Sequence, residues 1–345
     1  MLYILFTNFI AIFFAYCAKS KDKWFGLLFA FLVIWLFLSI RYDFGNDYMA
    51  YLEMHQEIQK GSIGDFNYEL GWVFINKIIP NFFLLIVLLS SFNCLVYYNY
   101  IKSYVIHDYW WLAVFMYCFN TNFMLIQSSA MRQTVAILIF IISFKYIINR
   151  NCIAYMFCCV LAVFFHESAL ILFPIYWIVL IPYDKRWYRL LIIVFFLTIY
   201  FVANSLQSFV AKIVLLIFQS KYEHFLVESS QVSILNAVLY AILLVIILEF
   251  TYNKKFEIRA FAWISILALF TFPLSSIVPM TARLGYYFFP ATMVTYTYIA
   301  RIMPLKMHYL FVFLLILVIL RRFEAIVYSD IWRDHFLIYK TIFNI

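Results

Sequence analysis

Long runs of apolar residues alternate along the whole chain with short stretches that carry charge, Asn or Pro. Most of these runs are long enough to cross a hydrocarbon core of about 30 Å as a helix. The pattern therefore predicts an all-α, polytopic integral membrane protein. We expect about twelve transmembrane helices, at residues 2–18, 24–40, 80–100, 109–126, 131–149, 152–166, 168–182, 188–205, 232–252, 260–277, 284–300 and 306–321.

Two longer polar segments interrupt the apolar runs. The first, residues 41–79, begins with Asn46 and Asp47, which can cap a helix start. Behind them, residues with an apolar or aromatic face recur at helical spacing: Tyr48, Tyr51, Leu52, His55 and Ile58. This spacing predicts a short amphipathic helix at the membrane surface.

The second polar segment, residues 204–231, has polar residues every four positions in an otherwise apolar stretch: Asn204, Ser208 and Lys212. Here too we expect a short interfacial helix. No internal repeat and no linker is visible in the sequence. The chain is therefore expected to form a single membrane-embedded domain over residues 1–345.

Composition narrows the class of protein further. Hydrophobic residues make up 67% of the chain and charged residues 12%, and an ordinary soluble enzyme has about 45–50% and about 25%. The six cysteines lie in apolar runs without a C-x-x-C spacing, so neither a metal site nor a disulfide framework is expected. The formal charge of +8 comes from basic residues scattered between helices, which argues against a nucleic-acid partner.

The scattered charges instead predict an orientation in the membrane. With the N-terminus outside, more than half of the 25 Lys and Arg residues lie at the cytoplasmic turns. Fewer than a third of the 17 acidic residues lie on that side. The C-terminal tail is then outside, although it carries four basic residues: Arg321, Arg322, Arg333 and Lys340.

Chemistry-bearing residues gather on the predicted outer face. Five of the six glycines lie there, at Gly45, Gly61, Gly64, Gly71 and Gly285. The first outer segment also contains carboxylates and aromatic rings that suit a sugar: Asp43, Asp47, Tyr48 and Glu69, with Arg41 at its start. A solvated loop with ordinary helix caps accounts for this composition equally well.

Arg132 and Gln133 stand at the predicted start of an apolar helix. A fixed cation and the free backbone N–H groups of a helix N-terminus together favour phosphate or pyrophosphate. Arg283 stands at a second such start, followed by Tyr286. The alternative is that these arginines only extend their charged ends to the membrane surface.

His166 and Glu167 lie between two apolar runs whose combined length requires a turn. A histidine at the outer membrane edge can act as a general base near neutral pH, and a carboxylate beside it can orient a neighbouring group. A purely structural histidine is the alternative. The chain has no H-E-x-x-H, Walker, G-x-S-x-G or D-x-D motif, so protease, NTPase and serine-hydrolase functions are unsupported.

With these residues in hand, the chain resembles the EpsG family of Wzy-like polysaccharide polymerases over most of its length. The resemblance rests on five segments in order: Arg41 to Tyr51 for R-x-x-x-G-x-D-Y-x-x-Y, Glu69 to Trp72 for E-x-G-[YW], Arg132 to Ala136 for R-Q-x-x-A, Phe165 to Leu170 for F-H-x-S-A-L, and Arg283 to Phe288 for the late arginine-aromatic element. Asn46 is a departure, because members often carry Thr or another small polar residue there.

The resemblance implies a bacterial inner-membrane glycosyltransferase that joins oligosaccharide repeat units carried on undecaprenyl pyrophosphate, with its active site facing the periplasm or cell exterior. The donor and acceptor lipids are then its partners, with a chain-length regulator protein as a further one, and it needs no metal, nucleotide or other cofactor. We expect His166, Arg132 and Arg283 to be catalytic. The residues expected to bind substrate are Arg41, Asp43, Asp47, Tyr48, Glu69, Gln133, Glu167 and Tyr286, with Glu69 and Asp47 as alternative bases.

Two other functions stay open on the sequence. The first is an O-antigen ligase or another polyprenyl-phosphate-dependent transferase, including a metal-using one served by Asp43 and Asp47. The second is a flippase of lipid-linked sugar. Transporters commonly have repeats and Gly- or Pro-broken helices at the midplane, whereas here Gly is scarce in the spans and the charges lie at the outer ends.

Overall fold

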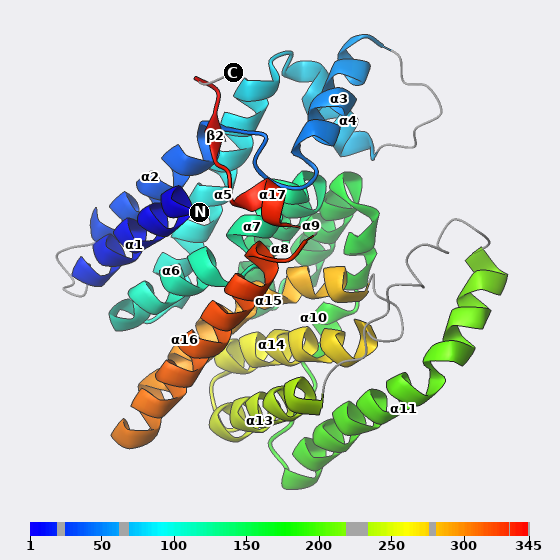
Figure 1. Ribbon diagram of the computed structural model, residues 1–345. Helices are drawn as coiled ribbons and strands as arrows, with labels where there is room; N and C mark the ends of the chain where they lie inside the picture. The colour runs from blue at the N-terminus through cyan, green and yellow to red at the C-terminus, as the bar shows by residue number, and fades with distance from the viewer. Residues whose placement is uncertain (19–24, 62–68, 219–233, 276–280, 331, 344–345) are drawn as a thin grey trace. The chain divides into compact units, whose positions relative to one another are not determined.

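The computed structural model describes residues 1–18, 25–61, 69–218, 234–275, 281–330 and 332–343, without the side chains of 203–218. Almost all of its regular structure is helical (Figure 1). The helices are α1 Leu2–Cys17, α2 Phe25–Ser39, α3 Tyr48–Gln59, α4 Leu70–Ile78, α5 Phe82–Tyr104, α6 Trp110–Phe119, α7 Met124–Ser129, α8 Met131–Ile148, α9 Cys152–Phe165, α10 Ile175–Ile178, α11 Arg186–Phe218, α13 Ile234–Thr251, α14 Phe256–Ser275, α15 Thr281–Ile302, α16 Leu305–Val327 and α17 Arg333–Phe336. Short 3₁₀ helices cover His107–Tyr109 and Glu167–Leu172, and the strands are β1 Arg41–Tyr42 and β2 Lys340–Thr341.

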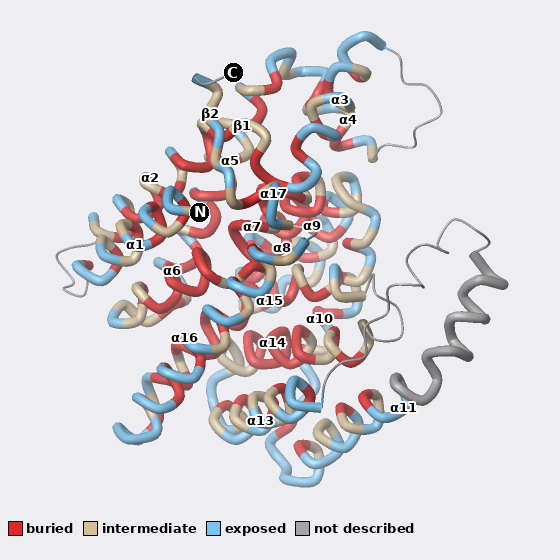
Figure 2. The backbone as a smooth tube through the Cα atoms, in the orientation of Figure 1, coloured by how far each residue is buried: buried red, intermediate tan, exposed pale blue. Residues whose placement is uncertain are grey.

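The chain divides into two compact units. The first contains residues Met1–Leu172 and Met303–Ile345, and the second contains Phe173–Ile302. In the first, α2 packs against α1 and α5, and α8 packs against α5 and α9. In the second, α14 packs against α13 and α15 and is buried along most of its length (Figure 2).

Several helices are apolar enough to cross a membrane. Within the described residues, α5, α8, α13 and α14 meet the length and hydropathy needed for a span. Shorter apolar helices include α1, α2 and α9. The expectation of an all-α, multi-pass membrane protein is therefore met, and the count of about twelve spans stays a prediction.

Two predicted helices are interrupted. The helix expected over 109–126 ends at Phe119, where Asn120 turns extended and its side chain accepts from the backbone N–H of Asn122. The helix expected over 168–182 is a 3₁₀ helix followed by the single turn α10. Pro174 stands between them and has no N–H to donate to a continuous helix.

The structure describes the first long polar segment more fully than the second. The first contains α3, whose face of Tyr48, Tyr51, His55 and Ile58 is buried against protein; its place at a membrane surface stays a prediction. Asp47 precedes α3, but its side chain makes no capping hydrogen bond. The second, 204–231, begins inside α11; its side chains and residues 219–233 lie outside the described part of the chain.

The C-terminal tail returns to the first polar segment. Strand β2 pairs antiparallel with β1, with Thr341 opposite Arg41. The Tyr339 hydroxyl donates to the Phe37 carbonyl at 2.5 Å, and the Met1 ammonium donates to the Leu337 carbonyl. Met1 and the described part of the C-terminal tail therefore lie at the same end of the first unit as the segment after α2.

Candidate active site

Glu69 joins two residues that are far apart in the chain. Its Oε2 accepts a hydrogen bond from Arg132 Nη1 at 2.5 Å, and its Oε1 lies 3.0 Å from His166 Nδ1. The Glu69 side chain is 10% exposed, and those of Arg132 and His166 are each 26% exposed. The three side chains thus form a cluster that is partly buried and still accessible.

Each member of the cluster stands at the end of a helix. Glu69 is the residue before α4, Arg132 is the second residue of α8, and His166 directly follows α9. The predicted helix start at Arg132 and the predicted turn at His166 are therefore present. Charged groups at helix ends reach the surface without a polar group being buried inside the apolar bundle.

Two glycines allow the backbones to approach closely enough to build this cluster. A Cβ on Gly71 would lie 2.8 Å from the Phe164 carbonyl oxygen, so α4 can pack directly on the end of α9. A Cβ on Gly45, whose φ is +108°, would lie 2.4 Å from the Ser128 carbonyl oxygen. The segment before α3 is therefore pressed against the chain that leads into α8.

Tyr51 of α3 contacts Arg132 through both its hydroxyl group and its ring. The Arg132 backbone N–H donates to the Tyr51 hydroxyl at 3.5 Å, and the guanidinium carbon lies 6.0 Å from the centre of the Tyr51 ring. The Tyr51 ring in turn meets Trp72 edge-on at 5.2 Å. The sequence placed Tyr51 on the apolar face of an amphipathic helix and in the first motif. Its spacing could not show that Tyr51 would contact Arg132.

A buried hydrogen-bond network holds α3 and α4 together. His55 Nδ1 lies 2.8 Å from Asn76 Oδ1, and His55 Nε2 lies 3.1 Å from the Pro80 carbonyl oxygen. The Asn76 amide also donates to the Trp72 carbonyl, and the Gln59 amide donates to the Asn76 carbonyl. This network fixes α4, and with it the position of Glu69.

The charges around Glu69 decide its protonation. Burial acts to raise the pKa of the Glu69 carboxyl, but the hydrogen bond from His166 and the charge of Arg132 outweigh it and hold the pKa below 4.5. Glu69 is therefore ionised at neutral pH and can only accept. Nδ1 of His166 must then carry the hydrogen, which leaves Nε2 of the neutral ring as a proton acceptor.

The N-terminus of α8 adds positive potential beside Arg132. This helix has 18 residues, and its N-cap residue, Ala130, makes no side-chain capping hydrogen bond. Its first N–H groups have no partner within the helix, and they carry the positive end of the helix dipole. Arg132 and this helix end are together suited to an anion such as phosphate.

The predicted ligands in the first polar segment form a separate group. Arg41 is 3% exposed, and Tyr48 donates to its backbone carbonyl at 3.3 Å. Burial raises the pKa of Tyr48 to about 12, so this phenol stays neutral. Asp43 pairs with Lys340 of β2 at 2.9 Å, and Asp47 accepts from the neighbouring Asn46 amide.

The other predicted residues are distributed over both units. Gln133 is buried in α8, and Glu167 is exposed at the start of the 3₁₀ helix after His166. Arg283 and Tyr286 lie in the first turns of α15, in the second unit. Within the described residues, no three His, Cys, Asp or Glu side chains are grouped so as to hold a metal ion.

The comparison with protein families is decisive for identity. The EpsG family model matches residues 24–341, nearly the whole chain. The chain belongs to the EpsG family. EpsG proteins are Wzy-like polysaccharide polymerases, so this EpsG protein is a membrane-bound polymerase of polysaccharide biosynthesis. No curated protein and no solved structure matches the chain.

Proposed function

We propose that this EpsG protein joins oligosaccharide repeat units carried on undecaprenyl pyrophosphate, on the outer face of the bacterial inner membrane. The observation that carries the proposal is the Glu69 cluster, in which one carboxylate binds both a cation and an imidazole. Joining such units requires a cationic site for the departing pyrophosphate and a base for the acceptor hydroxyl. The cluster contains both groups.

His166 acts as the general base in this proposal. The acceptor sugar hydroxyl gives its proton to Nε2 of His166, and the hydroxyl oxygen forms the new bond to the anomeric carbon of the donor chain. Glu69 holds the other ring nitrogen in its protonated form and stabilises the imidazolium that results. Glu69 is thus a positioning residue. Its lowered pKa makes it a weaker base than an ordinary carboxylate, so it is a poorer candidate for the base itself.

Arg132 binds the departing pyrophosphate in this proposal. The bond between the anomeric carbon and the pyrophosphate oxygen breaks, and the electron pair stays on the pyrophosphate. Its increased charge is stabilised by the Arg132 guanidinium and the N-terminus of α8. Glu69 accepts from Nη1, and the Tyr51 hydroxyl also hydrogen-bonds the Arg132 side chain. A guanidinium has five N–H donors, so Arg132 can add a phosphate to these two partners.

Arg283 is proposed as a second phosphate ligand, at the start of α15. The proposed sugar ligands are Asp43, Asp47, Tyr48, Gln133, Glu167 and Tyr286, and Arg41 remains a predicted ligand for the acceptor. These roles rest on the sequence motifs. The cluster around Glu69 is the part of the proposal that rests on contacts between side chains.

Substitution in cells tests the proposal. Arg132→Ala, His166→Ala and Arg283→Ala should each collapse the glycan ladder on a gel to single repeats, while the protein is still present in the membrane. Arg321→Ala is the matched control, because Arg321 is exposed and, within the described residues, pairs with Glu324 of its own helix. A normal ladder from any of the three variants removes that residue from the mechanism.

The phenotype of a deletion strain separates the alternatives. Loss of a polymerase leaves surface glycan that carries one repeat unit. Loss of a flippase leaves no surface glycan at all, and loss of a ligase leaves polymer that is not attached to its final acceptor. Activity that survives EDTA argues against a metal-using transferase.

A further inference from the structure

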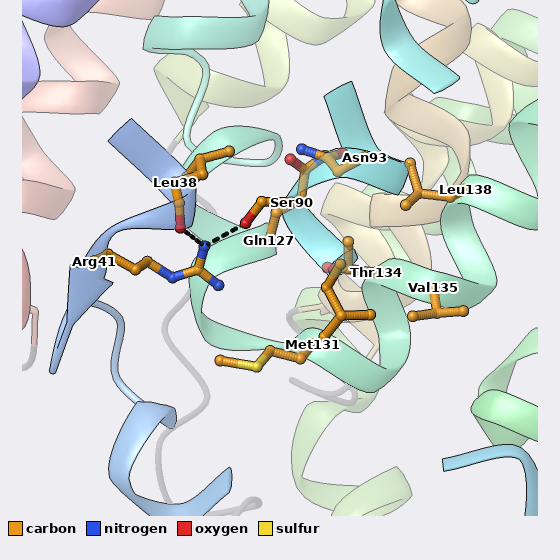
Figure 3. A pocket seen from close by; sticks show the side chains of 10 residues that line it. Leu38, Arg41, Ser90, Asn93, Gln127, Met131, Thr134, Val135 and Leu138 are labelled. Atoms are coloured by element: carbon orange, nitrogen blue, oxygen red, sulfur yellow. Dashed lines mark hydrogen bonds between the residues drawn. The ribbon is translucent and has the colours of Figure 1, made fainter. Parts of the chain in front are cut away.

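A second cation of the first unit is buried more deeply than Arg132. Arg41 Nη1 donates to the Leu38 carbonyl at 2.7 Å and to Ser90 Oγ at 3.3 Å (Figure 3). Its Nε is buried and has no hydrogen-bond partner. Among the described residues, no carboxylate lies within ion-pair distance of this guanidinium. A buried arginine stays charged, and an uncompensated buried charge is costly.

Beside Arg41 is a small polar cavity. Its volume is about 20 Å³, and the residues that matter here are Arg41, Ser90, Asn93, Gln127, Met131 and Thr134. One water-sized particle needs roughly 10–15 Å³ measured in the same way. In Figure 3 the guanidinium of Arg41 is turned toward Met131 and Thr134 across this space. The cavity therefore accepts one particle of about the size of water and is too small for a pyrophosphate.

Two features make the cavity electropositive. The first is the Arg41 side chain. The second is the N-terminus of α8, whose opening residues Met131 and Thr134 line the cavity and whose N-cap residue, Ala130, makes no side-chain capping hydrogen bond. The Thr134 hydroxyl is buried without a partner and can donate.

The amide of Asn93 can adapt to an anion. Its Nδ2 donates to the Tyr117 hydroxyl at 2.6 Å, which donates to Gln127 Oε1 at 2.5 Å, and Asn93 Oδ1 has no partner. The side-chain amides of Asn93 and Gln127 can both rotate by 180°. Gln127 then donates to the Tyr117 hydroxyl, and the Tyr117 hydroxyl donates to Asn93. The NH₂ group of Asn93 then replaces the unpartnered oxygen.

We propose that this cavity binds one small monovalent anion, a halide such as chloride, as the counter-ion of Arg41. The ion neutralises the guanidinium and accepts hydrogen bonds from Arg41 and Thr134. It thereby ties together α5, α8 and the segment after α2. In this proposal Arg41 has a structural role in place of the acceptor-binding role predicted from the sequence, because a pyrophosphate does not fit the cavity.

Thermal unfolding of the purified full-length protein tests the proposal. An anion that binds only the folded state stabilises it as its concentration rises. At constant ionic strength, replacing gluconate by chloride should raise the melting temperature of the wild-type protein, and Thr134→Val should reduce this rise. Thr292→Val is the control, because Thr292 is a buried threonine that donates within α15 and is not among the residues that line the cavity. An equal melting temperature in both salts overturns the proposal.

Bromide locates the ion directly. Crystals grown or soaked in bromide should show an anomalous-scattering peak beside Nε of Arg41. Density there without anomalous signal identifies an ordered water and overturns the proposal. This measurement uses the wild-type protein, so it does not depend on a variant that folds.

Discussion

At the scale of single residues, Glu69 determines the chemistry of the candidate active site. Its two oxygens bind two different donors, Arg132 and His166, so one side chain orients both the cation and the imidazole. Such a residue does not tolerate even an isosteric change. An amide has one accepting end and one donating end, and it must turn its NH₂ group toward one of the two partners.

Glu69→Gln is therefore expected to lower kcat by on the order of 10²-fold to 10⁴-fold, which is the range for losing general acid–base catalysis. The change in KM should be much smaller, because the variant removes orientation of the base and no contact to substrate. Polymerisation of lipid-linked repeat units in detergent measures both constants. Glu53→Gln, an exposed residue on α3, should leave both unchanged. A variant that changes KM alone would contradict the positioning role.

The lowered pKa of Glu69 also predicts how stability depends on pH. A carboxyl whose folded-state pKa lies below 4.5 stabilises the folded protein at all pH values above 4.5, and this contribution disappears as the pH falls through the folded value. The melting temperature of the wild type should therefore exceed that of Glu69→Gln at neutral pH. The difference should shrink below pH 4.5. A constant difference over the whole range would show that Glu69 does not titrate as described.

At the scale of elements, the site depends on close packing of the start of α4 against the end of α9, which a side chain larger than glycine would prevent. Gly71 lets α4 contact the last residues of α9, and this contact brings Glu69 to His166. The hydrogen bond between His55 and Asn76 holds α3 against α4. Tyr51 of α3 then contacts Arg132. The glycines of the first polar segment thus act through helix packing.

Gly71→Ala should separate α4 from α9, because its Cβ would lie 2.8 Å from a backbone oxygen that cannot turn away. We expect a loss of about 1–3 kcal/mol of stability, as for other overpacked sites. The glycan ladder should be lost at temperatures where the protein is still folded. Melting curves and the ladder measure the two effects.

Gly61→Ala is the matched control for this substitution. Its Cβ would have no atom within 4 Å, so only the positive φ of +73° is strained. The ladder should stay normal in this variant. If Gly71→Ala also keeps a normal ladder, close packing of α4 on α9 is not needed for activity.

At the scale of the whole molecule, the C-terminal tail and the N-terminus meet the segment after α2. Strand β2 pairs with β1. Helix α16, with 23 residues at about 1.5 Å each, has the length of a span, although it is not among the helices that also meet the hydropathy and charge expected of one. We predict that α16 spans the membrane, which places its start on the side opposite to the tail. The charge pattern of the sequence predicts that the side with the tail is the outside.

Labelling of introduced cysteines checks this arrangement. In a background with Cys17 and Cys152 replaced by serine, Asn46→Cys and Asp334→Cys should react with a membrane-impermeant thiol reagent added to the outside of cells. Lys306→Cys, at the start of α16, should react only after the membrane is opened. All three positions are exposed, and the four remaining native cysteines are buried. Labelling of Lys306→Cys from outside would contradict the predicted orientation.

The sequence by itself determined the class of the molecule and most of its helices. Apolar runs of membrane length can only be satisfied as helices, and five short motifs in order were enough to indicate the EpsG family. The motifs also contained Glu69, Arg132 and His166. The sequence placed Glu69 among sugar ligands and treated Glu167 as the carboxylate beside His166, because adjacent residues are the only neighbours that a sequence displays.

Only the tertiary structure decided which carboxylate meets which base. Glu69 reaches Arg132 and His166 because the packing of α4, α8 and α9 brings together residues separated by 63 and 97 positions. The same packing buries Arg41, which the motif presents as a substrate ligand, and leaves it beside a cavity instead of a carboxylate. Periodicity reports which face of a helix is apolar, but the neighbour of a polar residue depends on distant segments that pack only in the folded chain.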